Sequence, residues 1–351
     1  MHFIRANFAP TNQMAKQTTT AESILSELKN KHYQPIYFLM GEEPYYIDVI
    51  SDYIQHNVLD ETQREFDQTV LYGKETDIRT VINAAKRYPM IAQYQVVIVK
   101  EAQLIKDWDN LTFYLQQPLK STILVLCYKY GTPDGRKKWF TELKKTGVVF
   151  ESPKVRDYEI SAWISRYAKN KGLSIDEKAV VMLGEYLGTD LSKIANEIDK
   201  LLITKPKETE KITPELIETN IGISKDYNVF ELQAALINRD VLKANRIIRY
   251  FAENKKANPL VTILPQLFNF FSNLMLYHYL PDKSPQTAAS ELKINPYFVR
   301  DYQKAAQIFG AWKTMFIISY IREIDARHKG IDNVSADEGD LLKELVFKIL
   351  H

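Results

Sequence analysis

The chain has 351 residues, of which 45% are hydrophobic and 26% are charged, and its formal net charge is +2. This length allows about two or three domains with real hydrophobic cores, and the composition is that of a globular protein rather than a disordered or fibrous one. The small net charge excludes a uniformly basic nucleic-acid-binding protein, so any contact with DNA requires a local basic patch.

Cysteine and histidine usage excludes several kinds of site. The single cysteine, Cys127, lies in the apolar run TILVLCY, and the six histidines show no metal-ligand spacing. We therefore expect no intrachain disulfide framework, no metal site and no cofactor. Cys127 is interpreted as a small buried hydrophobic residue.

The N-terminal residues 1–17 contain no apolar core of signal-peptide length and predict a disordered tail. The most apolar long segment, 261–280, contains Pro265, Gln266 and Asn269, so it is interpreted as a buried helix rather than a membrane span. These features predict a cytoplasmic protein without membrane contact.

Strand and helix patterns alternate through residues 18–155. Five apolar, strand-like runs occur at 36–40, 69–72, 96–99, 122–128 and 147–151. Amphipathic segments, such as 76–88 and 134–145, lie between them. This alternation predicts βαβ units and a mostly parallel sheet with helices on both faces.

The strand signals stop after this part of the chain. Residues 156–223 predict a small helical domain, in which Thr213 caps a helix that begins with proline and ends near Gly222. Residues 224–351 predict a longer helical domain that is broken at prolines, with Ser335 as the N-cap of the last helix. The expected fold class is therefore α/β plus all-α, in three domains.

The first strand leads into a turn that resembles a nucleotide-binding loop and lacks its chemistry. A P-loop protein carries Gly-Lys-Ser/Thr here, whose backbone amides and lysine bind phosphates. This chain has Gly41-Glu42-Glu43-Pro44 instead, and it contains no Gly-Lys-Ser/Thr elsewhere. The two carboxylates suit the start of a helix but would repel a triphosphate.

The magnesium-binding half of a nucleotide site is also missing. Its carboxylate is expected after a later strand, where Lys100 and Glu101 follow the run VVIV. Because a cation cannot bind magnesium, we predict a degenerate nucleotide site that does not bind ATP and that consists of Gly41, Glu42, Glu43, Lys100 and Glu101. We also predict that the chain is not an enzyme. An ordinary α/β domain unrelated to ATPases accommodates the same residues equally well.

A proline-stopped helix is followed by two adjacent apolar residues. Pro89 restricts Tyr88 and cannot continue the helical hydrogen bonds. Met90 and Ile91 then stand in the short turn before the next strand. Their side chains either fold back into the core or project into a partner's pocket, and the sequence favours neither. A projecting pair contributes about 1.5–3 kcal/mol per side chain on burial in a partner.

Basic residues gather before and after Trp139. Arg136, Lys137 and Lys138 precede it, and two further lysines follow. This cluster invites a nucleic-acid interpretation. The simpler interpretation is a solvated helix face with Trp139 and Leu143 turned inward.

Six stretches in this order resemble the delta subunits of bacterial DNA polymerase III: IYFLMGEEPYYI, VVIVKEA, DGRKKWFTELKKTGVVFE, LGTDLSKIANEIDKL, NVFELQAAL and EIDARHKG. They extend from the first strand almost to the C-terminus. The resemblance implies a clamp-loader fold, with an AAA+-like domain at 18–155, a helical lid at 156–223 and a helical collar at 224–351.

The resemblance also implies a function. Delta subunits do not hydrolyse ATP, and they bind and open the ring-shaped sliding clamp (the beta subunit) for loading onto primed DNA. The implied partners are the gamma or tau ATPase and delta-prime subunits, in a heteropentamer that contacts primer–template DNA as a complex.

The family's clamp-binding residues are an apolar pair in the turn between helix and strand. That position corresponds here to Met90 and Ile91, preceded by Tyr88 and Pro89. Many members carry larger residues there, so this pair departs in size but not in character.

Candidate DNA contacts are Arg136, Lys137 and Lys138. These residues also support the alternative function, a DNA-binding helical scaffold unrelated to clamp loading.

Overall fold

The computed structural model describes residues 19–204, 211–222, 224, 226–333 and 335–351. The tail predicted for residues 1–17 lies outside these ranges. The chain forms two compact units, divided between Val155 and Arg156. A further division of the second unit into 156–223 and 224–351 stays a prediction.

The first unit is built on a five-stranded parallel sheet in the order β2-β3-β4-β1-β5. Its strands are β1 (Ile36–Gly41), β2 (Gln68–Tyr72), β3 (Gln95–Lys100), β4 (Thr122–Lys129) and β5 (Val148–Ser152). The three central strands are almost entirely buried, as expected for a parallel sheet that is covered on both faces. The predicted α/β class is confirmed.

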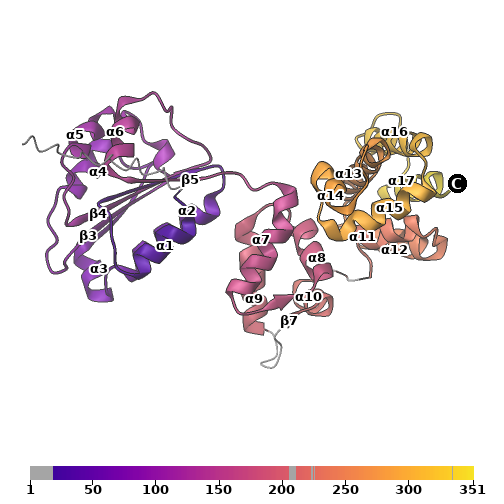
Figure 1. Cartoon of the computed structure of the whole chain (residues 1–351), viewed down its shortest axis with the longest axis horizontal. Helices are drawn as coiled ribbons and strands as arrows, with labels where there is room; N and C mark the ends of the chain where they lie inside the picture. Colours follow the sequence, from indigo (N-terminus) through magenta and orange to yellow (C-terminus); the bar gives the residue numbers. More distant parts are fainter. Residues whose placement is uncertain (1–18, 205–210, 223, 225, 334) are drawn as a thin grey trace, which may run out of the picture. The chain divides into compact units, whose positions relative to one another are not determined.

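Helices cover both faces of this sheet. Figure 1 shows α1 (Ala21–Lys29) and α2 (Pro44–Asn57) on one face, and α4 (Ile78–Ala85), α5 (Leu111–Leu115) and α6 (Lys138–Thr146) on the other. A short helix, α3 (Glu61–Asp67), leads directly into the edge strand β2, and two 3₁₀ turns, Ala102–Leu104 and Trp108–Asn110, follow β3. Alternate residues of each strand pack against opposite helix layers, so Phe38 and Leu39 belong to different cores.

Cys127 lies in the second of these cores and is fully buried in β4. Burial raises the pKa of its thiol to about 11, because the apolar surroundings disfavour the thiolate. The prediction of a buried hydrophobic cysteine is confirmed.

In the second unit, the described residues up to Gly222 form the helices α7 (Asp157–Asn170), α8 (Glu177–Leu187), α9 (Leu191–Thr204) and α10 (Pro214–Ile221). Thr213 is the N-cap of α10, and Gly222 ends it with a left-handed φ of 81°, as predicted. The prediction that strands stop in this region is wrong, because β6 (Ser174–Ile175) pairs in parallel with β7 (Lys211–Ile212). Two-residue strands are too short to leave a periodic pattern in the sequence.

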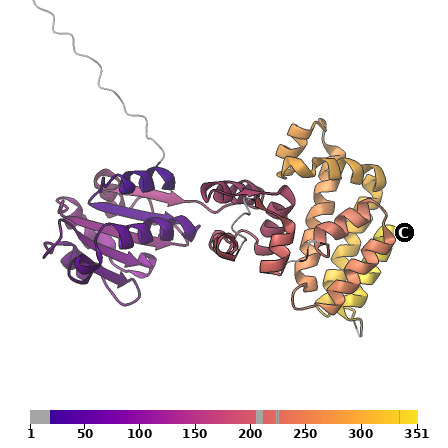
Figure 2. The same cartoon turned by 90° about the horizontal axis from the view of Figure 1, so that it is seen from below.

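The described residues after Gly222 form seven further helices: α11 (Val229–Ile237), α12 (Val241–Glu253), α13 (Leu260–Tyr279), α14 (Pro285–Leu292), α15 (Val299–Ile308), α16 (Ala311–His328) and α17 (Glu338–Leu350). A 3₁₀ turn, Pro296–Phe298, precedes α15. Figure 2 shows these helices in orange to yellow, and they share one hydrophobic core. The N-cap of α17 is Asp337 rather than the predicted Ser335, because the Asp337 carboxylate accepts the Asp340 N–H at 2.9 Å.

Among the described residues, α13 is the one helix with the length and composition to cross a membrane. Its apolar stripe packs into the shared core of the C-terminal helices, where Leu267, Phe271 and Leu274 are completely buried. The prediction that 261–280 forms a buried helix is confirmed.

Candidate interaction site

The turn between α4 and β3 carries the exposed apolar pair. Helix α4 ends at Ala85, earlier than the predicted segment 76–88, because side chains bind the last carbonyls of the helix. Gln95 Nε2 donates to the Ala84 carbonyl at 3.1 Å, and Thr122 Oγ1 donates to the Ala85 carbonyl at 3.0 Å. These bonds satisfy acceptors that a helix end otherwise leaves open and fix the point where the turn begins.

The side chains of this turn point into solvent. Tyr88 is 73% exposed, Met90 74% and Ile91 54%, while Pro89 is half-buried. Of the two arrangements that the sequence left open, the structure therefore has the projecting one. Adjacent large apolar side chains that remain exposed are typical of a surface that binds another protein.

A buried carboxylate holds the backbone of the same turn. Asp67, the last residue of α3, is 2% exposed. Its two carboxylate oxygens accept hydrogen bonds from the successive N–H groups of Met90 at 2.5 Å, Ile91 at 2.9 Å and Ala92 at 2.7 Å. Burial alone would raise the pKa of the Asp67 carboxyl, but these three bonds outweigh it and hold the pKa below its usual value.

The sequence interpretation missed Asp67. No motif connects it to a turn that follows more than twenty residues later. One signal was available: an acidic residue at the C-terminal end of a helix faces the negative end of the helix dipole, so its presence there suggests another partner.

The turn and the degenerate nucleotide site lie at opposite ends of the parallel strands. The turn precedes the amino end of β3, whereas Lys100 ends that strand and Gly41 ends β1. A six-residue strand separates its two ends by roughly 17 Å. Met90 and Ile91 are not at the carboxyl ends of the strands. The predicted residues of the nucleotide site are there: Gly41, Glu42, Glu43, Lys100 and Glu101.

Gly41 has a structural reason to be glycine. Its φ is 137°, and a Cβ atom there would lie 2.0 Å from the Ser152 carbonyl oxygen. Glu43 is the N-cap of α2 and accepts the Tyr45 N–H at 2.9 Å, and Glu42 is exposed just before it. The two carboxylates thus stand directly before the first turn of α2, which begins at Pro44.

Two ion pairs lie at the carboxyl ends of the strands. Lys100 Nζ lies 2.7 Å from Asp52, and Lys129 Nζ lies 2.7 Å from Asp48; both aspartates belong to α2. Burial would lower the pKa of Lys100, but the bond to Asp52 outweighs it and raises that pKa, so Lys100 remains a cation at neutral pH. Glu101 is exposed beside it with a left-handed φ of 55°. The carboxyl end of β3 therefore has a lysine, Lys100, at the position where magnesium binding would require a carboxylate.

The basic residues around Trp139 lie far from the exposed turn in the sequence. Helix α6 begins at Lys138, so Arg136 and Lys137 precede it rather than lying on the helix as predicted. The Arg136 guanidinium donates two hydrogen bonds to Asp134, at 3.0 and 2.9 Å. Trp139 and Leu143 are buried, which confirms that these two side chains turn inward.

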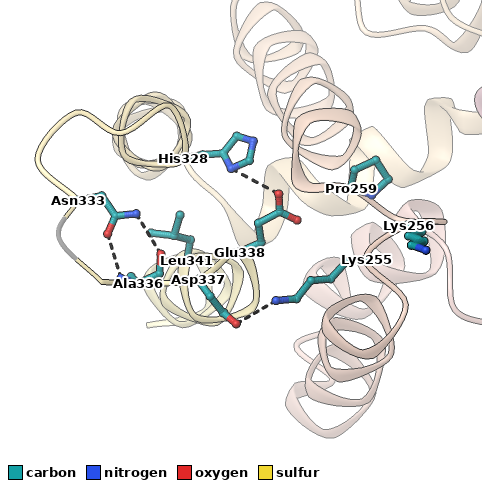
Figure 3. Close-up of a pocket in the computed structure, with 9 residues that line it drawn as sticks. All are labelled: Lys255, Lys256, Pro259, His328, Asn333, Ala336, Asp337, Glu338 and Leu341. Carbon is teal, nitrogen blue, oxygen red and sulfur yellow. Dashed lines mark hydrogen bonds and ion pairs between the residues drawn. The ribbon is translucent and has the colours of Figure 1, made fainter.

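A pocket of about 510 Å³ lies among the C-terminal helices and includes none of the predicted site residues. Two pairs of its side chains lie close together: Lys255 forms an ion pair with Asp337 at 3.0 Å, and His328 lies 3.7 Å from Glu338 (Figure 3). Within the described ranges, no three His, Cys, Asp or Glu side chains are grouped to hold a metal ion.

Comparisons with known proteins cover most of the chain. A family model described as DNA polymerase III, delta subunit, matches residues 37–152, and one for the C-terminal domain of that subunit matches residues 226–336. Between them, a model described as a middle domain matches residues 156–219.

Individual relatives point to the same family. The chain is 25% identical over 319 residues to the DNA polymerase III subunit delta of Bacillus subtilis, covering 87% of this chain and 91% of the relative. The solved structure of the Bacillus subtilis DNA clamp loader delta protein shares the fold, with a TM-score of 0.55, 23% identity, and coverage of 94% of this chain and 99% of that one. The chain therefore belongs to the DNA polymerase III delta subunit family.

Proposed function

We propose that this chain binds and opens the ring-shaped sliding clamp, as the subunit of a DNA polymerase III clamp loader that does not hydrolyse ATP. Its family membership supports a clamp-loader subunit in DNA replication. The proposed partners are the clamp itself, the gamma or tau ATPase and delta-prime subunits, and primer–template DNA through the complex. The proposed place of action is the cytoplasm.

The exposed turn at residues 88–91 carries this proposal. Met90 and Ile91 are apolar, adjacent and more than half exposed, and three backbone hydrogen bonds to Asp67 fix the chain that presents them. Burial of each side chain in a pocket of the clamp contributes about 1.5–3 kcal/mol. This is enough for the pair to anchor a protein–protein contact.

Clamp opening needs only a difference in binding energy. A ligand shifts a conformational equilibrium by as much as its affinities for the two states differ. The turn therefore opens the ring if Met90 and Ile91 fit the strained clamp interface better than the closed one. ATP binding by the partner subunits would orient the turn toward the clamp, and hydrolysis after DNA entry would withdraw it.

Clamp opening is tested with a clamp that carries a self-quenching fluorophore pair across one subunit interface. Adding this chain alone is expected to raise the fluorescence, because an opened interface separates the fluorophores. A clamp with its interface closed by a disulfide serves as the control and is expected to stay quenched. Absence of clamp binding, even with the partner ATPase and delta-prime subunits present, would contradict the proposed function.

ATP is expected not to bind this chain at micromolar concentrations, with or without magnesium. The turn before α2 offers Glu42 and Glu43 where phosphates require cations, and Lys100 stands where magnesium requires a carboxylate. Equilibrium dialysis of the purified chain with labelled ATP measures this directly, with an active P-loop ATPase as the positive control. Micromolar binding would instead favour a nucleotide enzyme with an unusual phosphate site.

Arg136, Lys137 and Lys138 remain proposed DNA contacts within the assembled complex. They are exposed near the start of α6, but the pairing of Arg136 with Asp134 reduces the positive charge that they present. The structure therefore gives the alternative function, a DNA-binding scaffold, no specific support.

A further inference from the structure

One carboxylate accounts for the backbone conformation of the proposed clamp-binding turn. Asp67 accepts hydrogen bonds from Met90, Ile91 and Ala92, three N–H groups in succession. It lies at the junction of α3 and β2, whereas the turn lies at the junction of α4 and β3. The parallel register brings them near each other: Gln68 is opposite Val96, so Asp67 lies beside the start of β3, shortly after the turn.

The exposed residues of the turn bury little side-chain surface. Tyr88, Met90 and Ile91 are mostly exposed, so their side chains contribute little burial to hold the backbone in place. Ordering such a segment at the moment of binding reduces affinity, whereas a segment that is ordered beforehand avoids that loss.

We propose that Asp67 is the positioning residue of the clamp-binding turn, and that its carboxylate presents Met90 and Ile91 to the clamp in an already ordered conformation. The inference rests on the proposed function. It assigns to a buried residue outside the contact surface a share of the clamp affinity.

The chemistry requires both oxygens and the negative charge. One Asp67 oxygen accepts from Met90, and the other accepts from Ile91 and Ala92. An asparagine offers one carbonyl oxygen, and its NH₂ group would face an N–H donor. The lowered pKa of Asp67 agrees with this arrangement, since hydrogen bonds to the charged form stabilise it.

The Asp67→Asn variant tests the inference, with Asp77→Asn as the matched control. Asp77 also has a lowered pKa and accepts a backbone N–H, from Thr80 at 2.7 Å, but it caps the start of α4 and does not contact the turn. Asp67→Asn is expected to speed hydrogen exchange of the Met90, Ile91 and Ala92 amides at least about tenfold, and to weaken clamp binding about tenfold. Asp77→Asn is expected to change neither. Thermal unfolding and protection of the Cys127 thiol establish that each variant is folded.

A double-mutant cycle separates positioning from general damage. On an Ile91→Ala background, Asp67→Asn is expected to weaken clamp binding by a smaller factor than on the wild type, because there is less apolar surface to position. An equal factor on both backgrounds, or unchanged amide exchange in folded Asp67→Asn, would overturn the inference.

Failure of the inference and failure of the proposed function have different signatures. If alanine at Met90 and Ile91 weakens clamp binding and Asp67→Asn does not, the function stands and the positioning role falls. If Asp67→Asn speeds amide exchange while neither variant changes clamp affinity, the clamp binds elsewhere on the chain, so the function stands while the clamp-binding turn and its positioning residue both fall. If the wild-type chain does not bind the clamp at all, even with the partner subunits present, the proposed function falls. Should Asp67→Asn not fold, Asp67→Glu provides the test, because it keeps both oxygens and the charge but displaces them by one methylene.

Discussion

The Met90→Ala/Ile91→Ala double variant is expected to lose about 2–5 kcal/mol of clamp-binding free energy, which is roughly a thirty- to four-thousandfold loss of affinity. Both side chains are exposed in the free chain, at 74% and 54%, so truncation removes contacts with the partner rather than core packing. The thermal stability of the free chain is therefore expected to stay the same. Titration calorimetry against the clamp of the same organism measures the loss.

Tyr130→Ala is the control for this double variant. Tyr130 is similarly exposed, at 71%. It follows the carboxyl end of β4, whereas the turn lies at the amino ends of the strands. Its truncation is expected to leave clamp affinity unchanged. If the double variant binds as tightly as the wild type, the clamp contact does not involve this turn.

The Gly41→Ala variant is expected to destabilise the first unit by about 3 kcal/mol or more. A Cβ atom at Gly41 would meet the Ser152 carbonyl oxygen at 2.0 Å, and the φ of 137° disfavours any other residue. Relief requires β1 to move away from the end of β5, which breaks the pairing of Met40 with Glu151. For a unit of this size, the loss corresponds to a fall in Tm of roughly 6–12 °C. Clamp affinity of the folded fraction is expected to stay the same, since Gly41 lies at the carboxyl ends of the strands and the turn lies at their amino ends.

Gly131→Ala is the matched control, because Gly131 forms the bridge to Gly41 but a Cβ atom there meets nothing within 4 Å. Its stability is expected to lie within about 0.5 kcal/mol of the wild type. Labelling of the buried Cys127 thiol provides a second readout, since the thiol reacts only when the first unit opens. A Gly41→Ala variant as stable as Gly131→Ala would show that glycine is not required at this turn.

The elements that the sequence predicted correctly are those with local causes. The strands of the first unit are continuous apolar runs bounded by turn residues, and Thr213 with its following proline marks a helix start without help from distant contacts. Pro89 likewise predicted the end of α4 within a few residues. These features depend on neighbours along the chain, which is the information that a single sequence contains.

The features that could not be predicted depend on contacts between distant residues. The backbone N–H groups of Met90 and Ile91 are bound by Asp67, which is far from them in the sequence and meets them only in the folded chain. The sequence placed Lys100 at the end of a strand, but nothing in it indicated that Asp52 of α2 would pair with that lysine. The β6–β7 pairing likewise forms between segments separated by two helices.

Photo-crosslinking tests most directly whether the clamp binds at this turn. The side chain of Ile91 is replaced by benzoylphenylalanine in one preparation and that of Tyr130 in another, and each is irradiated with the clamp. Both positions are exposed, but they lie at opposite ends of the parallel strands. A crosslink to the clamp from position 91 and none from position 130 is the predicted result. A crosslink from position 130 alone, or none from either while the two proteins bind, would contradict the account.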